Sequence, residues 1–321
     1  MNSKISLIIP TYNRATILKE LLEALKNQTL PLDEYEIIIV DNNSSDNTNE
    51  VANSFKNFFP SLKVIFEKNP GLHNGRHAGY INANSEILVY ADDDIEPKKT
   101  WLESIYDAFQ DLNVSMVGGN NFPLYQEKPP KWILSLWKKG IFSSYQSIPA
   151  LSIINFFGPD REISPHLVWG CNFSVRKSVI KDAGGFHPDG MPKDKIVYRG
   201  DGESYISSFV EQSNKKCVFI SGASVFHKIP AERMTFEYFK QRGFNQGISQ
   251  SFRDLREPKN IKYKSIISRI NNKINLLIKS KEAKHAIKEM RLGFSQGYAF
   301  HQDAYFKSKK LQEWVHKKDF L

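Results

Sequence analysis

Three adjacent carboxylates, Asp92, Asp93 and Asp94, follow an apolar segment of strand length in the stretch VYADDDIEP. Two unit charges about 4 Å apart repel by roughly 4 kcal/mol at an effective dielectric constant near 20, so folding should avoid this cluster unless a cation binds it. Hard divalent cations prefer carboxylate oxygens and keep coordination positions for water or phosphate. The triplet therefore indicates a site for Mn²⁺ or Mg²⁺. The alternative is an exposed acidic turn before the helix that follows Pro97, where negative charge is favourable.

Polar side chains also follow two earlier apolar segments. Pro10, Thr11, Tyr12 and Arg14 come after KISLII at residues 4–9, and Asp41 ends YEIIIVD at residues 35–41. A turn role is the alternative for Asp41, because the sequence DNNSSDN that it begins is rich in turn-forming residues.

The segments that must position these side chains alternate between strand and helix. Apolar runs predict strands at residues 4–9, 35–41, 62–67 and 86–91, and helical spacing predicts helices after Arg14, near residues 47–58 and at residues 100–109. Such alternation indicates a parallel sheet covered by helices on both faces. Ligands of these sheets bind outside the carboxyl ends of the strands, so Asp41 and the acidic triplet should share one crevice.

The regular alternation stops between residues 120 and 165, where the chain is rich in proline and aromatic residues. A loop of that length is usually a lid, a binding loop or a misread element. Trp132, Ile133, Leu136 and Trp137 have helical spacing, which predicts either a helix packed on the core or an acceptor-side or membrane-facing element. Strands are predicted again at residues 168–175, 216–221 and 223–228.

Five motifs, in order, resemble those of the inverting family-2 glycosyltransferases, which use nucleoside-diphospho-sugars and have the GT-A fold. They are SLIIPTYNR, IIIVDNNSSDNT followed by DDD, NPGLHNGRHAG, VWGCNFSVRKSVIKDAGGF and RGDGES, and the similarity covers about residues 4–250. The resemblance implies an α/β fold of GT-A type, with a Rossmann-like, mixed and mainly parallel sheet flanked by helices. It implies a catalytic domain at 1–234, with a nucleotide-sugar-binding half (1–118) and an acceptor-binding half (119–234), and a basic helical region at 235–321.

The resemblance also implies a set of donor-binding residues. The strand-end segment and Asp41 would hold the nucleoside, Arg14 and Arg233 would contact phosphate, and Arg76 would approach the diphosphate unless it is a solvated helix arginine. The full set for the nucleotide-sugar is Pro10, Thr11, Tyr12, Arg14, Asp41, Arg76, Asp92 and Asp93.

The chemistry that the resemblance implies divides between a metal and a base. Asp92 and Asp94 would hold Mn²⁺ or Mg²⁺, and His227 would be a further ligand unless it only bonds to the backbone. The metal would neutralise charge on the leaving nucleoside diphosphate. Asp201 would act as general base in a single displacement with inversion. RGDGES has Gly200 where the family usually has Glu, with Glu203 as the following acid, which leaves details of acceptor binding open.

The expected substrates follow from the same resemblance. The donor is a nucleoside-diphospho-sugar, with UDP favoured by family habit, and the acceptor is a saccharide or a lipid-linked saccharide in surface polysaccharide synthesis. The segment HKIPAERMTFEYFKQRGFNQG resembles the continuation found in enzymes of that kind.

The basic charge is confined to the C-terminal part of the chain. Residues 231–321 carry 20 Lys and Arg against 9 Asp and Glu, whereas the whole chain has a net charge of +9. This asymmetry, and the basic amphipathic stretch KYKSIISRINNKINLLIKS, predict docking on an anionic membrane surface, with an ordinary solvated basic face as the alternative. The short apolar run Leu7–Ile9 predicts no signal peptide, and two cysteines fit a reducing compartment. We therefore expect a cytoplasmic protein, peripheral on the inner face of the plasma membrane where the basic region docks.

Two other functions compete with the enzyme. The altered RGDGES motif would fit a nucleotide-sugar-binding protein with impaired catalysis, and the basic tail would fit a nucleic-acid-binding protein. The tail has no stacking-module motif, so we expect no nucleic acid partner. Gly71, Gly75 and Gly79 lack the Gly-x-Gly turn of dinucleotide sites, which disfavours NAD.

Overall fold

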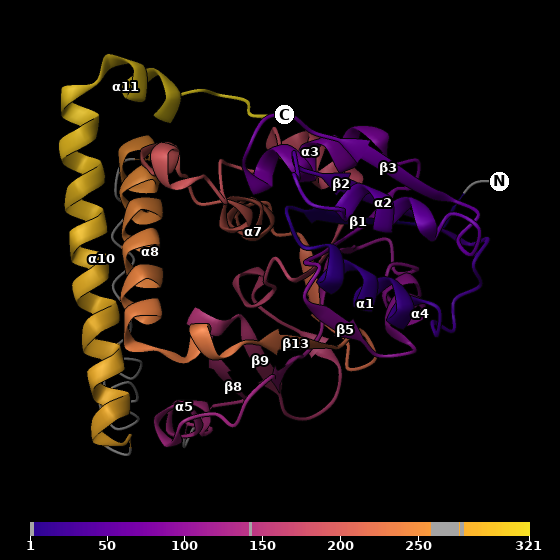
Figure 1. Cartoon of the computed structure of the whole chain (residues 1–321), viewed down its shortest axis with the longest axis horizontal. Coiled ribbons are helices and arrows are strands. Elements are labelled where there is room, and N and C mark those ends of the chain that lie inside the picture. The colour runs from indigo at the N-terminus through magenta and orange to yellow at the C-terminus, as the bar shows by residue number, and fades with distance from the viewer. Residues whose placement is uncertain (1–2, 141–142, 258–275, 277–278) are drawn as a thin grey trace.

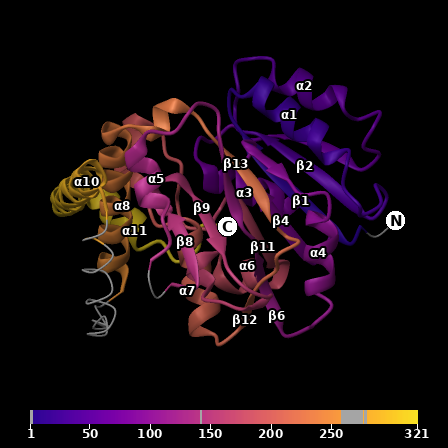
Figure 2. The same ribbon diagram turned by 90° about the horizontal axis from the view of Figure 1, so that it is seen from below.

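The computed structural model describes residues 3–140, 143–257, 276 and 279–321 (Figure 1). Most of the predicted stretch 262–280 lies outside the described residues. The fold contains two sheets, a set of helices around the larger sheet, and a long helical pair at one side of the molecule (Figures 1 and 2).

The larger sheet has eight strands in the order β10-β12-β6-β11-β4-β1-β2-β3. Its neighbours β4, β1, β2 and β3 run parallel, β11 is antiparallel to both β4 and β6, and β10 is antiparallel to β12. The strands are β1 (Ile5–Thr11), β2 (Tyr35–Asp41), β3 (Leu62–Phe66), β4 (Ile87–Ala91), β6 (Val114–Gly118), β10 (Arg161–Glu162), β11 (Asn172–Arg176) and β12 (Lys216–Phe219). The predicted mixed, mainly parallel sheet is confirmed.

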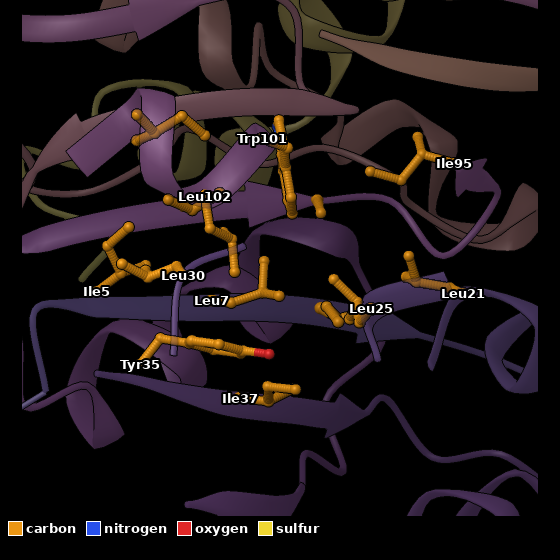
Figure 3. Packing of buried hydrophobic residues seen from close by; sticks show 14 of the residues in the cluster. Ile5, Leu7, Leu21, Leu25, Leu30, Tyr35, Ile37, Ile95, Trp101 and Leu102 are labelled. Atoms are coloured by element: carbon orange, nitrogen blue, oxygen red, sulfur yellow. The ribbon is translucent and has the colours of Figure 1, made fainter. Parts of the chain in front are cut away.

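Helices cover both faces of this sheet, because successive strand residues point to opposite faces. Leu7 and Ile9 of β1 face a core that includes Leu18 and Trp101, and Figure 3 shows Leu7 and Trp101 within it. Ile8 faces a second core that includes Ala78. Helices on the first face are α1 (Ala15–Leu25), α2 (Thr48–Ser54) and α4 (Trp101–Ala108); those on the second are α3 (Leu72–Asn82), α6 (Lys177–Ala183) and α7 (Glu203–Gln212).

The sequence did not predict the second sheet, which has five strands in the order β5-β13-β7-β9-β8. These are β5 (Ile95–Pro97), β7 (Asn121–Tyr125), β8 (Tyr145–Ile148), β9 (Ile153–Phe156) and β13 (Val225–Ile229). Three of the five come from the region between residues 120 and 165, which is therefore a structured subdomain rather than one long loop. Short 3₁₀ turns accompany it and its neighbours: η1 (Pro149–Leu151), η2 (Pro165–Leu167), η3 (Lys193–Tyr198) and η4 (Ala231–Met234).

A pair of long helices, α8 (Phe236–Arg256) and α10 (Lys281–Lys307), lies beside the two sheets (Figure 1). Glycines allow their backbones to touch, because a Cβ atom at Gly243 would come 2.0 Å from the carbonyl oxygen of Met290, and one at Gly247 2.1 Å from that of Phe294. The helix α11 (Lys309–Val315) follows α10.

The predicted helix in the proline-rich region is α5 (Lys131–Trp137). Trp132 and Ile133 are buried in a cluster with Phe239 of α8 and with Ala283 and Ala286 of α10. This packing favours the core interpretation of that helix over a membrane-facing one. None of the described helices is both long and apolar enough for a membrane span.

Candidate active site

The carboxyl ends of β1, β2 and β4 meet at a pocket of about 510 Å³. It brings together the segment after β1, the turn after β2, the acidic triplet after β4, and loops before α3 and after residue 189. Its lining residues include Pro10, Thr11, Tyr12, Arg14, Asn42, Asn43, Gly71, Leu72, Asp92, Asp93, Asp94, Pro192 and Arg233. We refer to it as the donor-side pocket.

The middle carboxylate of the triplet organises the segment after β1. Asp93 accepts hydrogen bonds from Thr11 Oγ1 at 2.7 Å and from Arg14 Nη1 at 2.6 Å, and its side chain is buried. Arg14 also lies 3.3 Å from Asp94 Oδ2. These bonds join the two motifs that the sequence placed at neighbouring strand ends. They also mean that the triplet is not an exposed acidic turn, since α4 begins only at Trp101, after strand β5.

The other two carboxylates of the triplet converge with a histidine. One ligand atom each from Asp92, Asp94 and His227 lie within 4.8 Å of one another. Asp94 Oδ1 is buried without a hydrogen-bond partner among the described residues. His227 Nδ1 is 3.0 Å from the carbonyl oxygen of Leu151, so that nitrogen can donate and leave Nε2, 3.2 Å from Asp94 Oδ1, as a ligand. This donor set fits a hard divalent cation such as Mn²⁺ or Mg²⁺.

The electrostatics of the triplet differ from residue to residue. Burial alone would raise the pKa of Asp94, but the charges of Arg233 and Arg14 hold that pKa well below its usual range. Arg233 Nη2 lies 2.8 Å from Asp94 Oδ2. Burial and the neighbouring charge of Asp94 raise the pKa of Asp92 to about 6. Asp92 has no ion pair within the described residues, so it is the carboxylate with most to gain from a bound cation.

A second pocket, of about 400 Å³, adjoins the first and shares Leu72 and Asp92 with it. We refer to it as the acceptor-side pocket. Its other lining residues include Arg76, Trp169, Gly170, Asp189, Arg199, Asp201, Glu203, Arg242, Gln246, Ser249, Gln250, Arg253 and Phe294. Asp201 and the metal candidate Asp92 therefore line one cavity, although the sequence separates them by more than a hundred residues.

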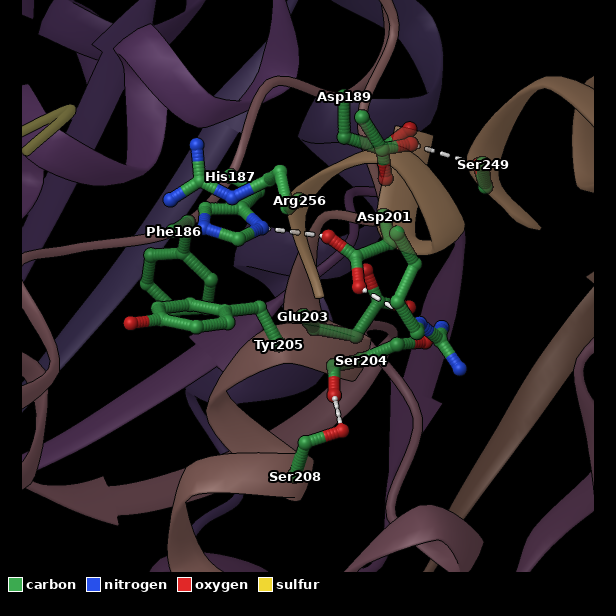
Figure 4. A network of polar contacts seen from close by, with 12 residues as sticks. Phe186, His187, Asp189, Asp201, Glu203, Ser204, Tyr205, Ser208, Ser249 and Arg256 are labelled. Carbon is green, nitrogen blue, oxygen red and sulfur yellow. Dashed lines mark hydrogen bonds and ion pairs between the residues drawn. The ribbon is translucent and has the colours of Figure 1, made fainter. Parts of the chain in front are cut away.

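Two carboxylates at the start of α7 differ in how firmly they are held. Asp201 Oδ1 lies 2.5 Å from His187 Nδ1 (Figure 4). Asp201 Oδ2 accepts a hydrogen bond from Arg253 Nε at 3.0 Å. Its side chain is 4% exposed. Burial lowers the pKa of His187 despite this contact, so the ring is neutral and donates Nδ1–H to Asp201.

The Glu203 side chain is 26% exposed and pairs with Arg76 at 3.2 Å. Gly170 leaves room for this pair, because a Cβ atom there would lie 2.3 Å from Arg76 Nη2 and 3.2 Å from Glu203 Oε1. Arg76 itself is only 2% exposed and stacks on Phe186, which excludes the alternative of a solvated helix arginine.

One predicted donor-binding residue has a different setting. Asp41 is buried and accepts a hydrogen bond from the backbone N–H of Ser44 at 2.9 Å, which is a turn contact. Its neighbours Asn42 and Asn43 line the donor-side pocket. The nucleoside-binding role of Asp41 stays a prediction.

The sequence did not predict the contribution of α8. Arg242, Gln246, Ser249, Gln250 and Arg253 recur at intervals of one, three and four residues, so they lie on one face of the helix, and all line the acceptor-side pocket. The spacing of polar residues was the available signal, but it does not identify the element that the face opposes.

In this Rossmann-like mixed sheet, carboxylates after β4 meet a histidine of the second sheet, His227 of β13, beside a second polar pocket. This is the architecture of a GT-A nucleotide-sugar domain. The model of Glycosyl transferase family 2 matches residues 6–183. The chain belongs to this family.

Individual relatives agree with that membership. The chain is 35% identical over 183 residues to glycosyltransferase AglE of Haloferax volcanii, a match covering 57% of this chain and 55% of AglE. It is 33% identical over 110 residues to minor teichoic acid biosynthesis protein GgaA of Bacillus subtilis, covering 33% of this chain and 25% of that protein. The chain thus spans about half the length of AglE, and less of GgaA.

The solved mannosyltransferase PcManGT of Pyrobaculum calidifontis, in complex with GDP-Man and Mn²⁺, superposes with a TM-score of 0.54 at 16% identity. That match covers 98% of this chain and 84% of the other, and it shows a shared fold.

Proposed function

We propose that this protein is a metal-dependent, inverting glycosyltransferase. It moves a sugar from a nucleoside-diphospho-sugar to a hydroxyl of a saccharide or lipid-linked saccharide. The observation that carries the proposal is the junction of two pockets at Asp92, with a metal-ligand set on one side and the carboxylates of Asp201 and Glu203 on the other.

The donor-side residues would bind and orient the nucleotide-sugar. Tyr12, 58% exposed at the pocket, offers an aromatic face, and Asn42 and Asn43 offer amide groups. Arg14 and Arg233 would meet the diphosphate. Asp92, Asp94 and His227 would hold Mn²⁺ or Mg²⁺, which when bound stabilises the negative charge on the departing nucleoside diphosphate.

The acceptor hydroxyl would attack the anomeric carbon from the face opposite the diphosphate. A bond forms between the acceptor oxygen and that carbon, the bond to the phosphate oxygen breaks, and the hydroxyl proton passes to a carboxylate. One displacement of this kind inverts the anomeric configuration.

Two carboxylates compete for the role of base. Asp201 is the residue that the sequence predicts, and it lines the same cavity as Asp92. Both of its oxygens already accept hydrogen bonds, which fixes the orientation of the carboxylate and favours a positioning role. Glu203 has one ion pair and more exposure, which favours it as the proton acceptor. We propose that the base is one of these two residues. Mutating each of them in turn distinguishes which one accepts the proton.

The identity of both substrates belongs to the proposal. A UDP-sugar is the donor favoured by family habit, whereas the structural neighbour binds GDP-Man. Similarity to a minor teichoic acid biosynthesis protein supports an acceptor in surface polysaccharide synthesis. We propose a cytoplasmic location, with the basic C-terminal region docked on the inner face of the plasma membrane.

Donor hydrolysis tests the function without knowledge of the acceptor. We would incubate the full chain with UDP-, GDP-, TDP- and CDP-sugars, with and without Mn²⁺, and measure released nucleoside diphosphate. Slow release from at least one donor, only with the metal, is expected, and Asp94→Asn should abolish it.

The same assay separates the enzyme from a binding protein with impaired catalysis. Such a protein would bind a donor and release nothing above the blank, even with added saccharide acceptors. That outcome would overturn the catalytic proposal while leaving the binding site intact.

A further inference from the structure

The charges in the acceptor-side pocket are almost, but not completely, paired. Four arginines and four carboxylates line it: Arg76, Arg199, Arg242 and Arg253, with Asp92, Asp189, Asp201 and Glu203. Three ion pairs account for six of these groups: Arg76–Glu203 at 3.2 Å, Arg199–Asp189 at 2.6 Å and Arg253–Asp201 at 3.0 Å. Asp92, a candidate metal ligand, and Arg242 are left over.

Arg242 has neither an ion pair nor a side-chain hydrogen bond to any part of the chain that the structure describes. Its Nε is buried without a hydrogen-bond partner. Leaving a buried donor unsatisfied costs free energy of folding, and the cost is larger for a charged group. Such a group is retained where a ligand supplies the missing acceptor, and the planar guanidinium fork matches phosphate and carboxylate.

The location of Arg242 indicates that the anionic group it binds belongs to the acceptor substrate rather than to the donor. Arg242 lines only the acceptor-side pocket, whereas Arg14 and Arg233 line the donor-side pocket with the acidic triplet. The donor diphosphate therefore has its own arginines.

The helix that carries Arg242 is firmly placed. Gly243, the next residue, packs against the backbone of Met290 on α10, and Gly247 packs against that of Phe294. Gln246, one turn after Arg242, lines the same pocket and adds a neutral amide donor, and Trp169 adds an aromatic surface suited to a sugar ring. The guanidinium is thus presented by a fixed helix rather than by a loop.

We propose that the acceptor is anionic, and that its phosphate or carboxylate group binds Arg242 beside the transferred sugar. This inference rests on the proposed glycosyltransferase function, and it narrows the acceptor from saccharides in general to those with a negative charge near the receiving hydroxyl.

Ligand-observed NMR on the full chain tests this proposal. The protein is first saturated with Mg²⁺, which is diamagnetic, and with the nucleoside diphosphate that binds best, so that the donor side is filled. Glucose 6-phosphate, glucuronate and glucose are then titrated as phosphate, carboxylate and neutral probes. At least one anionic sugar should bind more tightly than glucose, and which one does identifies the anionic group.

Three variants give the residue-level answer. Arg242→Gln should weaken the anionic sugar about tenfold and leave nucleoside diphosphate binding unchanged, while Arg242→Lys, which keeps the charge but loses the fork, should fall between. Arg291→Gln is the matched control, because it removes the same charge from an exposed position on α10.

Equal affinity of glucose and the anionic sugars, no binding of either anion, or equal loss in both glutamine variants would overturn the proposal. If the wild-type chain binds no nucleoside diphosphate at all, that result would instead contradict the proposed function. The two failures are therefore distinguishable.

Discussion

At the scale of single residues, the three carboxylates of the acidic triplet differ in the partners that neutralise their charge. Arg14 and Thr11 satisfy Asp93, and Arg233 and His227 surround Asp94. Asp92 has no such partner among the described residues and lies where the two pockets meet. These partners explain how Asp93 and Asp94 can be buried side by side, and they leave the partly exposed Asp92 available to a cation.

The choice of base is the first prediction at this scale. Asp201→Asn and Glu203→Gln keep side-chain shape and an oxygen for the arginine partner, so both variants should fold. At least one should lower kcat by about 10² to 10⁴ with the donor Kd unchanged, since general bases contribute that much. If Asp201→Asn stays active and Glu203→Gln does not, the base is Glu203. Activity near the wild-type level in both variants would refute both Asp201 and Glu203 as the base.

Which residues could be predicted depends on how local their signal is. The acidic triplet and the segment Pro10 to Arg14 stand at the ends of strongly apolar strands, so sequence order alone places them at one sheet edge. Arg242 and Arg253 belong to the site only because α8 packs across it. No local pattern encodes that contact, and the sequence therefore did not predict it.

At the scale of elements, the α8–α10 pair forms the far wall of the acceptor-side pocket. Its glycines set the spacing of the two backbones, and the buried Ser251–His301 contact, 2.7 Å from Oγ to Nδ1, lies between them.

The sequence did not predict the five-stranded sheet, because the local signal of its strands is weak. β8 and β9 have four residues each, too few for a clear alternation of apolar and polar residues.

Gly247→Ala tests the backbone contact. The added Cβ would lie 2.1 Å from a main-chain oxygen that cannot rotate away, so the helices must separate. We expect a loss of about 1–3 kcal/mol in the free energy of unfolding, measured by chemical denaturation. Ser295→Ala, at an exposed position of α10, should change it by less than about 0.5 kcal/mol. Equal effects in both variants would argue against close packing as the role of the glycine.

The pH dependence of stability tests His301. Burial lowers its pKa from 6.5 to about 4, so between these values the unfolded chain binds a proton that the native chain does not. The free energy of unfolding should therefore fall as the pH drops from 6.5 to 4, by about 3 kcal/mol from this residue. Denaturation curves of His301→Gln should show a correspondingly smaller loss between pH 7 and pH 4. An identical loss in wild type and variant would contradict a buried neutral histidine.

At the scale of the whole molecule, the loop after β4 and the long helices α8 and α10 meet across the acceptor-side pocket. Asp92 follows β4, Glu203 begins α7, and Phe294 lies on α10, so the complete pocket requires the folded chain from the first strands to α10. Beyond the pocket, α10 and the start of α11 expose Phe306, which is 71% accessible, beside Lys307, Lys309 and Lys310.

Membrane docking is the prediction at this scale. The full chain should sediment with anionic vesicles and not with zwitterionic ones, because each basic residue near an anionic surface contributes about 1 kcal/mol to the free energy of binding. Added salt should release the chain from the vesicles, since it screens these charges. Lys309→Glu with Lys310→Glu should weaken sedimentation more than the matched pair Lys19→Glu with Lys56→Glu, exposed on α1 and after α2. Sedimentation independent of lipid charge and salt would rule docking out.

The central claim is that a divalent cation and a nucleoside diphosphate bind together at Asp92 and Asp94. Thermal unfolding of the full chain, with UDP, GDP, TDP and CDP, each with and without Mn²⁺, measures this directly. One nucleoside diphosphate at about a hundred times its Kd should raise the Tm by roughly 5 °C in the presence of Mn²⁺, and Asp94→Asn should lose that rise. If no nucleoside diphosphate raises the Tm with Mn²⁺, or if Asp94→Asn responds as the wild type does, the account is wrong.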